Sequence, residues 1–475
     1  MEKFYVTTPI YYVNDDPHIG HAYTTIVADV FARYYRQKLG ANNVFFLTGT
    51  DEHGAKVAQA ASKRGLEPQE FVDGISNHYQ EMWRQLNISH DYFIRTTHPE
   101  HKRIVQELLQ KLYDKGYIYK AKYKGTYCVG CEKYLTAEEI VDGKCVLHPS
   151  TDLFEQEEEN YFLKLKDLVP HVLIALESER YMVLPKERKT EILSKMREGI
   201  HDISISRTGI EWGIPLPWDT SHTVYVWVDA LFNYYSATRI NPDAARFWPA
   251  DLHLMAKDIL WFHALIWEAL LLALQEELPK TVFAHGFFTI EGQKMSKSLG
   301  NVINPLDLVN IYGVDGLRYL LISSFAFGND GDFSLTRFEE IYNADLANGI
   351  GNLVSRIAKL CEKSDHDFSE VVKNYKPFFN EGLDAAMTSS RPDEALRFIR
   401  NDVQALDKQI HEDAPWTLND AELIQTLESY IPKVLSLAND LKPFLPQTVE
   451  KIVTIFNVGK ISKPEPLFKR VSIQV

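Results

Sequence analysis

The chain has 475 residues, of which 45% are hydrophobic and 24% are charged, and its formal net charge is −14. This length predicts two to four domains with a large buried core, as in a soluble enzyme. The net negative charge argues against nonspecific binding of polyanions, because phosphate contacts need local positive charge, but it is compatible with a specific RNA met by a few basic patches.

The first segments predict a β-α-β unit. Residues 4–13 are rich in Thr, Val, Ile and Tyr, which favours a strand, and this strand begins too close to Met1 to leave room for a signal peptide. Residues 20–39 place apolar side chains on one helical face, and residues 44–47 form the next buried strand. Such a unit predicts a parallel sheet with a right-handed crossover. Residues 48–54 follow the second strand, at the edge where open α/β sheets bind ligands.

The rest of the chain predicts an α/β protein in which a Rossmann-type parallel sheet is interrupted by an insertion and followed by an all-α domain. We expect strands at 223–228, 251–255 and 281–288, mostly helix from about 343, and a tail at 464–468 that folds back onto the body. The apolar run 270–274 is too short to span a bilayer. The predicted division is first catalytic half 1–115, connective insertion 116–220, second catalytic half 221–300, linker 301–345, and helical domain 346–475.

Two motifs carry the strongest functional signal. His18, Gly20 and His21 lie where a strand gives way to a helix, whose N-terminus attracts phosphate. Gly20 lets an adenine ring approach the backbone, and the histidines can donate hydrogen bonds to the α-phosphate of ATP. Lys294 and Lys297 lie on a short loop with two serines and would stabilise the charge of a departing pyrophosphate. Either motif alone also fits an ordinary solvated loop, but the ordered pair is the signature of class I aminoacyl-tRNA synthetases.

A metal site is predicted in the insertion. Three of the four cysteines, Cys128, Cys131 and Cys145, form with His148 two pairs of x2 spacing separated by about a dozen residues. Each pair supplies two ligands, so four protein ligands would close a tetrahedral shell around one structural Zn²⁺. So few cysteines, clustered in this way, also favour a reducing, cytoplasmic compartment over a disulfide framework.

Over residues 4–470 the chain resembles the bacterial type of the methionyl-tRNA synthetase family, on residues 7–12, 48–54, 225–230 and 257–259 as well as the two motifs. The resemblance implies an ATP-dependent, AMP-forming methionine–tRNA ligase, with Mg²⁺ accompanying ATP. Asp51 would bind the amino group of methionine, and Tyr12 or His263 would donate a hydrogen bond to its sulfur. Arg207 would reach toward ATP and the lysine loop. The implied methionine site consists of Ile10, Tyr12, Asp51, Trp227, Ala230, Tyr234, Ile259 and His263.

The resemblance also implies a tRNA-binding end. Asn352 and Arg356 share one helix face, and with Trp416 they would read the CAU anticodon of initiator and elongator tRNA(Met). The insertion is too short for a separate editing domain, which disfavours the isoleucine, valine and leucine enzymes. Some members have a dimerising C-terminal domain that we do not expect here, so we expect a monomer. One departure is Ala256, where the family usually has glycine; its methyl group faces the expected adenine position.

Two alternatives stay open at this point. A small-molecule nucleotidyltransferase shares the His-x-Gly-His device, but it would need neither the zinc insertion nor a long helical domain. A regulatory RNA-binding protein derived from a synthetase would be expected to lose catalytic groups, whereas His18, His21, Asp51, Lys294 and Lys297 are all present.

Overall fold

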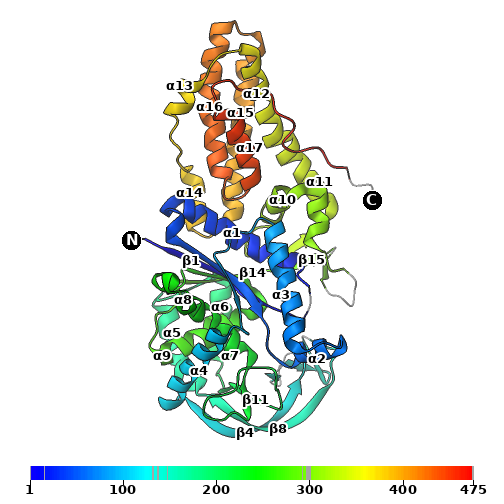
Figure 1. Cartoon of the computed structure of the whole chain (residues 1–475), viewed down its shortest axis with the longest axis vertical. Helices are drawn as coiled ribbons and strands as arrows, with labels where there is room; N and C mark the ends of the chain where they lie inside the picture. Colours follow the sequence, from blue (N-terminus) through cyan, green and yellow to red (C-terminus); the bar gives the residue numbers. More distant parts are fainter. Residues whose placement is uncertain are drawn as a thin grey trace.

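The computed structural model describes residues 2–14, 16–130, 133–135, 139–146, 148–290, 292–295 and 301–472, with the backbone alone at 123, 124, 133, 134, 156–158, 293 and 294. The molecule is elongated (Figure 1). A sheet-containing body lies at its middle, a β-rich insertion at one end and a helical domain at the other. This arrangement confirms the predicted fold class, an α/β parallel-sheet core with an insertion and an α-helical C-terminal region.

The body is organised around a six-stranded parallel sheet in the order β3-β2-β1-β13-β14-β9. Its strands are β1 (Phe4–Tyr12), β2 (Val44–Asp51), β3 (Tyr92–Arg95), β9 (Met182–Leu184), β13 (Leu252–Ala256) and β14 (Thr281–His285). After β1 the chain adds β2 and β3 on one side of β1. Later it forms β13 on the other side of β1. The gap between the carboxyl ends of β1 and β13 is therefore a topological switch point, the usual ligand site of such sheets.

Helices cover both faces of this sheet and bury two separate apolar clusters, one on each side. One cluster is formed with α1 (Ile19–Leu39), α2 (Ala55–Lys63), α3 (Pro68–Gln85) and α10 (Pro305–Ser323). The other is formed with α4 (Pro99–Asp114), α5 (Leu165–Glu177), α6 (Lys186–Arg197), α7 (Val226–Leu231), α8 (Asn233–Ile240), the π-helix η5 (Phe262–Trp267) and α9 (Glu268–Leu274). Short helices η1 (Ala41–Asn43), η3 (Pro242–Phe247) and η4 (Lys257–Ile259) complete the body.

One predicted strand is wrong in its second half. Residues 223–228 were expected to be extended, but β12 ends at Val224 and helix α7 begins at Val226. The β-branched valines Val226 and Val228 favour a strand locally. Tertiary burial overrides that preference, because the helical conformation turns both valines into the apolar cluster and places the Asp229 carboxylate against two buried histidines.

The insertion forms the opposite end of the body from the helical domain (Figure 1). Long antiparallel strands β4 (Ile118–Cys128) and β8 (Leu153–Leu163) pair along their whole length and are extended by β5 (Lys133–Tyr134) and β10 (Ile203–Ser204). Smaller pairs are β6 (Ile140–Val141) with β7 (Lys144–Cys145), and β11 (Ser206–Thr208) with β12 (His222–Val224). Segment 116–220 also contains β9. Within this segment the chain therefore returns to the main sheet, where β9 forms the edge opposite β3.

A three-stranded sheet precedes the helical domain and consists of β15 (Phe288–Ile290), β16 (Gln293–Lys294) and β17 (Gly331–Phe333). The domain itself consists of α11 (Leu335–Ile341), the π-helix η7 (Tyr342–Gly351), α12 (Asn352–Ser364), α13 (Ser369–Asn374), α14 (Glu381–Thr388), α15 (Pro392–Asp413), η8 (Pro415–Thr417), α16 (Asp420–Leu441) and α17 (Pro446–Phe456). The tail folds back, as predicted, but onto the helical domain and not onto the sheet-containing body: Phe468 packs edge-on against Tyr342, and Arg470 donates to Asn348, both in η7. Within the described part of the chain, none of the helices combines the length and apolarity needed to cross a membrane.

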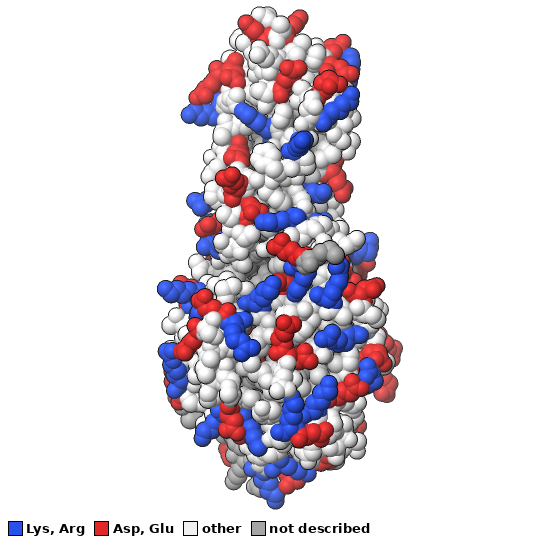
Figure 2. Space-filling model, turned by 90° about the vertical axis from the view of Figure 1, so that its left-hand side faces the viewer, with Lys and Arg blue, Asp and Glu red and all other residues white. Residues whose placement is uncertain are grey.

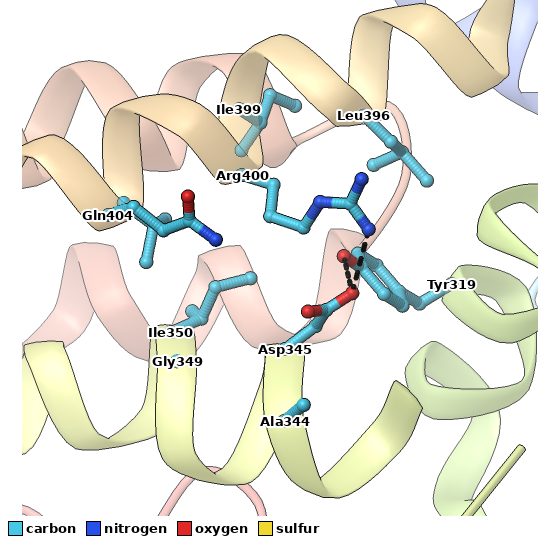
Figure 3. A pocket seen from close by; sticks show the side chains of 10 residues that line it. Tyr319, Ala344, Asp345, Gly349, Ile350, Leu396, Ile399, Arg400 and Gln404 are labelled. Atoms are coloured by element: carbon cyan, nitrogen blue, oxygen red, sulfur yellow. Dashed lines mark hydrogen bonds and ion pairs between the residues drawn. The ribbon is translucent and has the colours of Figure 1, made fainter. Parts of the chain in front are cut away.

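The helical domain is joined to the body by polar contacts, one of which is fully buried. Arg318 of α10 is fully buried, pairs with Asp29 of α1 at 2.6 Å and donates through Nε to the carbonyl of Phe444, between α16 and α17. Figure 3 shows a second contact, at a small cavity between α10, η7 and α15. There the Asp345 carboxylate accepts from the Tyr319 hydroxyl at 2.9 Å and from Arg400 at 3.3 Å.

Candidate active site

The two histidines of the N-terminal motif lie at the switch point between β1 and β13, at the start of α1. His18 is the N-cap residue, and its Nδ1 accepts from the amide of Gly20 at 3.1 Å. The amide of His18 in turn donates to Nδ1 of His21 at 3.2 Å, and the two rings stack with centroids 3.7 Å apart. Because each Nδ1 accepts a backbone hydrogen bond, each neutral ring carries its proton on Nε2.

Both rings are neutral at physiological pH. Burial lowers the pKa of His18 to about 4. Burial, reinforced by the neighbouring His18, lowers the pKa of His21 well below its ordinary value. Two Nε2–H donors at a helix N-terminus form a preorganised site for phosphate oxygens, and these donors keep their protons over the whole physiological range.

The structure places Met295, the one fully described residue of the lysine motif, next to the histidine motif. A Cβ atom placed on Gly20 would lie 3.6 Å from Cε of Met295, which lies between the two lysines. The amide of Ile19 donates to the carbonyl of Ile303, just beyond the loop, at 3.1 Å. The backbone of Lys294 belongs to β16, whereas its side chain and the whole of Lys297 lie outside the described residues. Met295, the last described residue before the gap at 296–300, therefore lies beside the start of α1.

The predicted methionine site is assembled from strand ends and from the opposite helices. Tyr12, the last residue of β1, is directly paired with Asp51, the last residue of β2. Trp227 and Ala230 come from α7, Tyr234 from α8, and His263 from the π-helix η5. Ile10, Tyr12, Trp227 and Ile259 are partly buried side chains that pack against the same apolar cluster. The geometry thus gathers the predicted residues on one side of the switch point.

Hydrogen bonds decide which side chain could donate to a thioether. Nδ1 of His263 lies 3.0 Å from the carbonyl of Ile259, which can only accept, so this nitrogen carries the proton. Nε2 of His263 then accepts from the Tyr234 hydroxyl at 2.8 Å. Burial lowers the pKa of His263 to about 4, so the ring has no second proton. His263 is therefore excluded as the donor to sulfur in this arrangement, which leaves Tyr12 of the two residues considered.

Two aromatic residues of the site were missed from the sequence. Phe262 stacks on Trp227 with centroids 3.9 Å apart and an interplanar angle of 6°, and so fixes the plane of the indole ring. The Tyr79 hydroxyl lies 3.3 Å from Nδ1 of His21, and its ring stacks on Tyr11. Phe262 could have been found from its position next to His263. Tyr79 lies in an amphipathic helix, where its spacing indicates only core packing.

Two further predicted residues have surroundings that the sequence did not reveal. Arg207 is buried in β11, donates to Ser204 and to the carbonyl of Ser206, and lies over the Tyr225 ring at 4.2 Å. Its role toward ATP and the lysine loop stays a prediction. Ala256 ends β13 at the switch point and is paired with His285 of β14. Its position at the carboxyl end of that strand agrees with the expected approach of a nucleotide.

Three of the four predicted metal ligands are described, and they come together in the insertion. Cys128 and Cys145 are buried, and their sulfur atoms and a ring nitrogen of His148 lie within 4.8 Å of one another. A Cβ on Gly130 would lie only 2.4 Å from Cγ of His148, so a glycine is needed for the ring to reach the cluster. Thiolates and imidazole at this separation fit a tetrahedral Zn²⁺. Cys131, the predicted fourth ligand, lies outside the described residues.

The proposed anticodon residues are on the surface of the helical domain. Trp416 is 50% exposed at the α15–α16 junction, and Asn352 is exposed at the start of α12. Arg356 is half-buried and pairs with Asp407 of α15 at 2.5 Å. Figure 2 shows another face of the molecule, on which acidic and basic side chains are interspersed along its length. On that face no extended basic field is visible.

Comparison with known proteins agrees with this geometry. The family model for class I tRNA synthetases (M) matches residues 4–152 and 135–358. A methionine–tRNA ligase of Thermotoga maritima is 42% identical over 95% of this chain and 74% of the relative. The ligase of Nostoc sp. is 38% identical over 99% of this chain and 97% of the relative.

Solved structures show the same fold. A Mycobacterium tuberculosis methionyl-tRNA synthetase in complex with methionyl-adenylate superposes with a TM-score of 0.90 at 33% identity and covers 99% of this chain and 100% of that one. The apo form of the Mycobacterium tuberculosis enzyme gives a TM-score of 0.84 at 29% identity, over 100% and 99% of the two chains. The switch-point site, the two motifs and the full-length matches lead to one assignment: the chain belongs to the methionyl-tRNA synthetase family, the methionine–tRNA ligases of class I.

Proposed function

We propose that the chain joins L-methionine to tRNA(Met) in two steps at the switch-point site. First, a carboxylate oxygen of methionine attacks the α-phosphorus of ATP, the bond to the bridging oxygen breaks, and pyrophosphate leaves with its Mg²⁺. Second, a hydroxyl of the 3′-terminal ribose of the tRNA attacks the carbonyl carbon of methionyl-adenylate and releases AMP. Both steps depend mainly on positioning and charge stabilisation.

The observation that carries this proposal is the pair of neutral histidines at the start of α1, with Met295 of the lysine motif beside Gly20. His18 and His21 direct their Nδ1 atoms to backbone amides, which leaves two Nε2–H donors for the α-phosphate. Met295 beside Gly20 supports a loop position from which Lys294 and Lys297 would neutralise the leaving pyrophosphate. Uncharged donors for the α-phosphate, together with lysines that would meet the pyrophosphate, match a reaction in which charge moves from the α-phosphate toward the leaving group.

The same proposal assigns roles in substrate binding. The Asp51 carboxylate would bind the methionine ammonium, since it ends β2 beside Tyr12 at the edge of the apolar pocket. Trp227, braced by Phe262, and Tyr234, locked to His263, would enclose the side chain. Asn352, Arg356 and Trp416 would read the anticodon, in a monomer. Cys128, Cys131, Cys145 and His148 would hold one Zn²⁺, which as a closed four-ligand site stabilises the insertion and takes no part in the chemistry.

Amino-acid-dependent ATP–pyrophosphate exchange, measured with each amino acid in turn, tests the function. We expect exchange with methionine alone among the natural amino acids, and charging of tRNA(Met) on addition of the tRNA. Elemental analysis of the same preparation should find about one zinc per chain, and Cys131→Ala should lose the zinc together with thermal stability. Exchange with another amino acid and none with methionine would contradict the proposal.

A further inference from the structure

A buried carboxylate that none of the roles above uses lies immediately behind the methionine site. Asp229 of α7 is 1% exposed, and each of its oxygen atoms faces a different histidine. Oδ2 lies 2.6 Å from Nδ1 of His53, and Oδ1 lies 2.8 Å from Nε2 of His101. Burial raises the pKa of Asp229, but the two histidines outweigh it and hold the pKa at about 2, so the group is a carboxylate at every physiological pH.

The network joins separate parts of the chain. His53 follows Asp51 by two residues at the end of β2, and His101 belongs to α4 of the body. His101 continues the chain of contacts through Nδ1 to the Ser236 hydroxyl of α8 at 2.7 Å. One carboxylate therefore connects the strand end that carries Asp51 with the helix that carries Trp227 and Ala230. Through His101 and Ser236 it also reaches the helix that carries Tyr234.

The ring of His53 depends on this carboxylate for its orientation. Both histidines are buried, but only His101 has partners for both nitrogens. Nε2 of His53 is buried and has no hydrogen-bond partner in the described part of the structure, so the bond to Asp229 is the ring's polar anchor. An edge contact with Trp212, centroids 5.6 Å apart, supplies packing without a hydrogen bond. Loss of the carboxylate would thus remove the hydrogen bond that ties His53, two residues after Asp51, to α7, while the backbone at residues 52 and 54 keeps its own bonds to Thr96 and Trp212.

We propose that Asp229 is a positioning residue for methionine binding, which acts by bracing the Asp51 loop against the helices that form the side-chain pocket. The inference rests on the proposed function, because it takes Asp51, Trp227 and Tyr234 as the methionine site. Asp229 itself does not need to contact substrate. Its effect is selective, because the brace lies on the methionine side of the switch point, whereas the phosphate donors His18 and His21 are fixed by their own backbone hydrogen bonds.

Asp229→Asn is the sharpest test, because the amide keeps the size of the side chain and can still accept one hydrogen bond. We expect the KM for methionine in ATP–pyrophosphate exchange to rise about tenfold or more, as for small displacements of positioned groups, while the KM for ATP stays within about threefold. Ser236→Ala, at the outer end of the network, should change the methionine KM in the same direction by about two- to threefold. Asp440→Asn, at a buried aspartate of the helical domain, is the matched control and should change neither the KM for methionine nor the KM for ATP.

A double variant separates bracing from general destabilisation. If Asp229 acts through His53, then Asp229→Asn combined with His53→Gln should raise the methionine KM no further than the more damaging single change. An unchanged methionine KM in folded Asp229→Asn would overturn the inference. It would also be overturned if the KM for methionine and the KM for ATP rose together while the melting temperature fell. If Asp229→Asn does not fold, Ser236→Ala decides by the same criterion. Wild-type protein without methionine-dependent exchange would instead refute the proposed function itself.

Discussion

The body and the helical domain present their proposed functional residues in opposite ways. In the body, His18, His21 and Asp229 each make two or more hydrogen bonds or ring contacts, are largely buried, and lie where the topology of a parallel sheet gathers strand ends. In the helical domain, Trp416 and Asn352 project from helix ends into solvent. The difference matches the ligands proposed for the two regions: a small molecule must be enclosed in fixed geometry, whereas unpaired bases are captured by exposed stacking and polar groups.

The strongest test of this contrast is removal of a group that acts only in the transition state. Lys297→Ala should lower the rate of methionyl-adenylate formation by roughly 10²-fold or more, because its ammonium would meet charge that develops on the leaving pyrophosphate. Methionine affinity should change little. Pre-steady-state adenylate formation measures the effect directly, with Lys359→Ala, an exposed lysine of α12, as the control. An unchanged rate would remove Lys297 from the mechanism.

The helical domain should respond in the other assay. Base–aromatic stacking contributes about 1–3 kcal/mol, so Trp416→Ala should reduce the kcat/KM of tRNA charging roughly tenfold to a hundredfold. Exchange without tRNA should stay near the wild-type rate, because adenylation uses residues of the body. Phe378→Ala is a matched control, since Phe378 is an exposed aromatic residue (67%) of the same domain.

Two results would contradict this view of Trp416. Loss of both activities in a protein with a normal melting curve would assign Trp416 a structural role. Retention of both activities would mean that the anticodon is read elsewhere.

The same contrast explains how far the sequence could be interpreted. The β-α-β start, the two motifs and the cysteine pattern were visible because each needs specific residue types at fixed short spacings. The brace at Asp229 was not, because His53, His101 and Asp229 are far apart in sequence and meet only through the sheet topology. The strand expected through Val228 failed for a related reason, since burial of α7 outweighs local propensity. In the helical domain, Arg356 has spacing no different from that of any solvated helix, and its ion pair with Asp407 could not be predicted.

The body and the helical domain can also be compared in stability, through one buried acidic residue in each. Glu268 of α9 is 0% exposed, and neither carboxyl oxygen has a hydrogen-bond partner in the described structure, so burial raises its pKa well above the usual range. A neutral carboxyl buried without partners costs about 1–3 kcal/mol, so Glu268→Met, which is similar in size, should raise the free energy of unfolding by about that amount. In the helical domain, burial raises the pKa of Asp440 to about 7, but this group accepts from the amide of Asn380, and Asp440→Met should therefore destabilise.

The pH dependence of Glu268 has a definite sign. The unfolded chain releases this proton near pH 4.3, whereas the folded protein keeps it to a much higher pH. The contribution of Glu268 to stability is therefore highest below about pH 4.3 and is lost progressively as the pH rises toward the folded pKa. The advantage of Glu268→Met over the wild type should grow between pH 5 and pH 8 in thermal or urea unfolding. A constant difference would show that Glu268 is already ionised in the folded state.

The smallest expected effect is at Ala256, the position where this chain departs from the family's usual glycine. Ala256 ends β13 beside the switch point, with φ −79° and ψ 155°, a conformation that alanine adopts without strain. Substitution by glycine would therefore relieve no backbone strain and would act only by removing a methyl group from the expected adenine position. A methyl group in partial contact is worth a fraction of the ~0.8 kcal/mol of a buried CH₂, so Ala256→Gly should change the KM for ATP by no more than about threefold and leave the methionine KM unchanged. A much larger decrease in the ATP KM would show that the methyl group displaces the nucleotide, and a larger increase would show that it packs against the adenine ring.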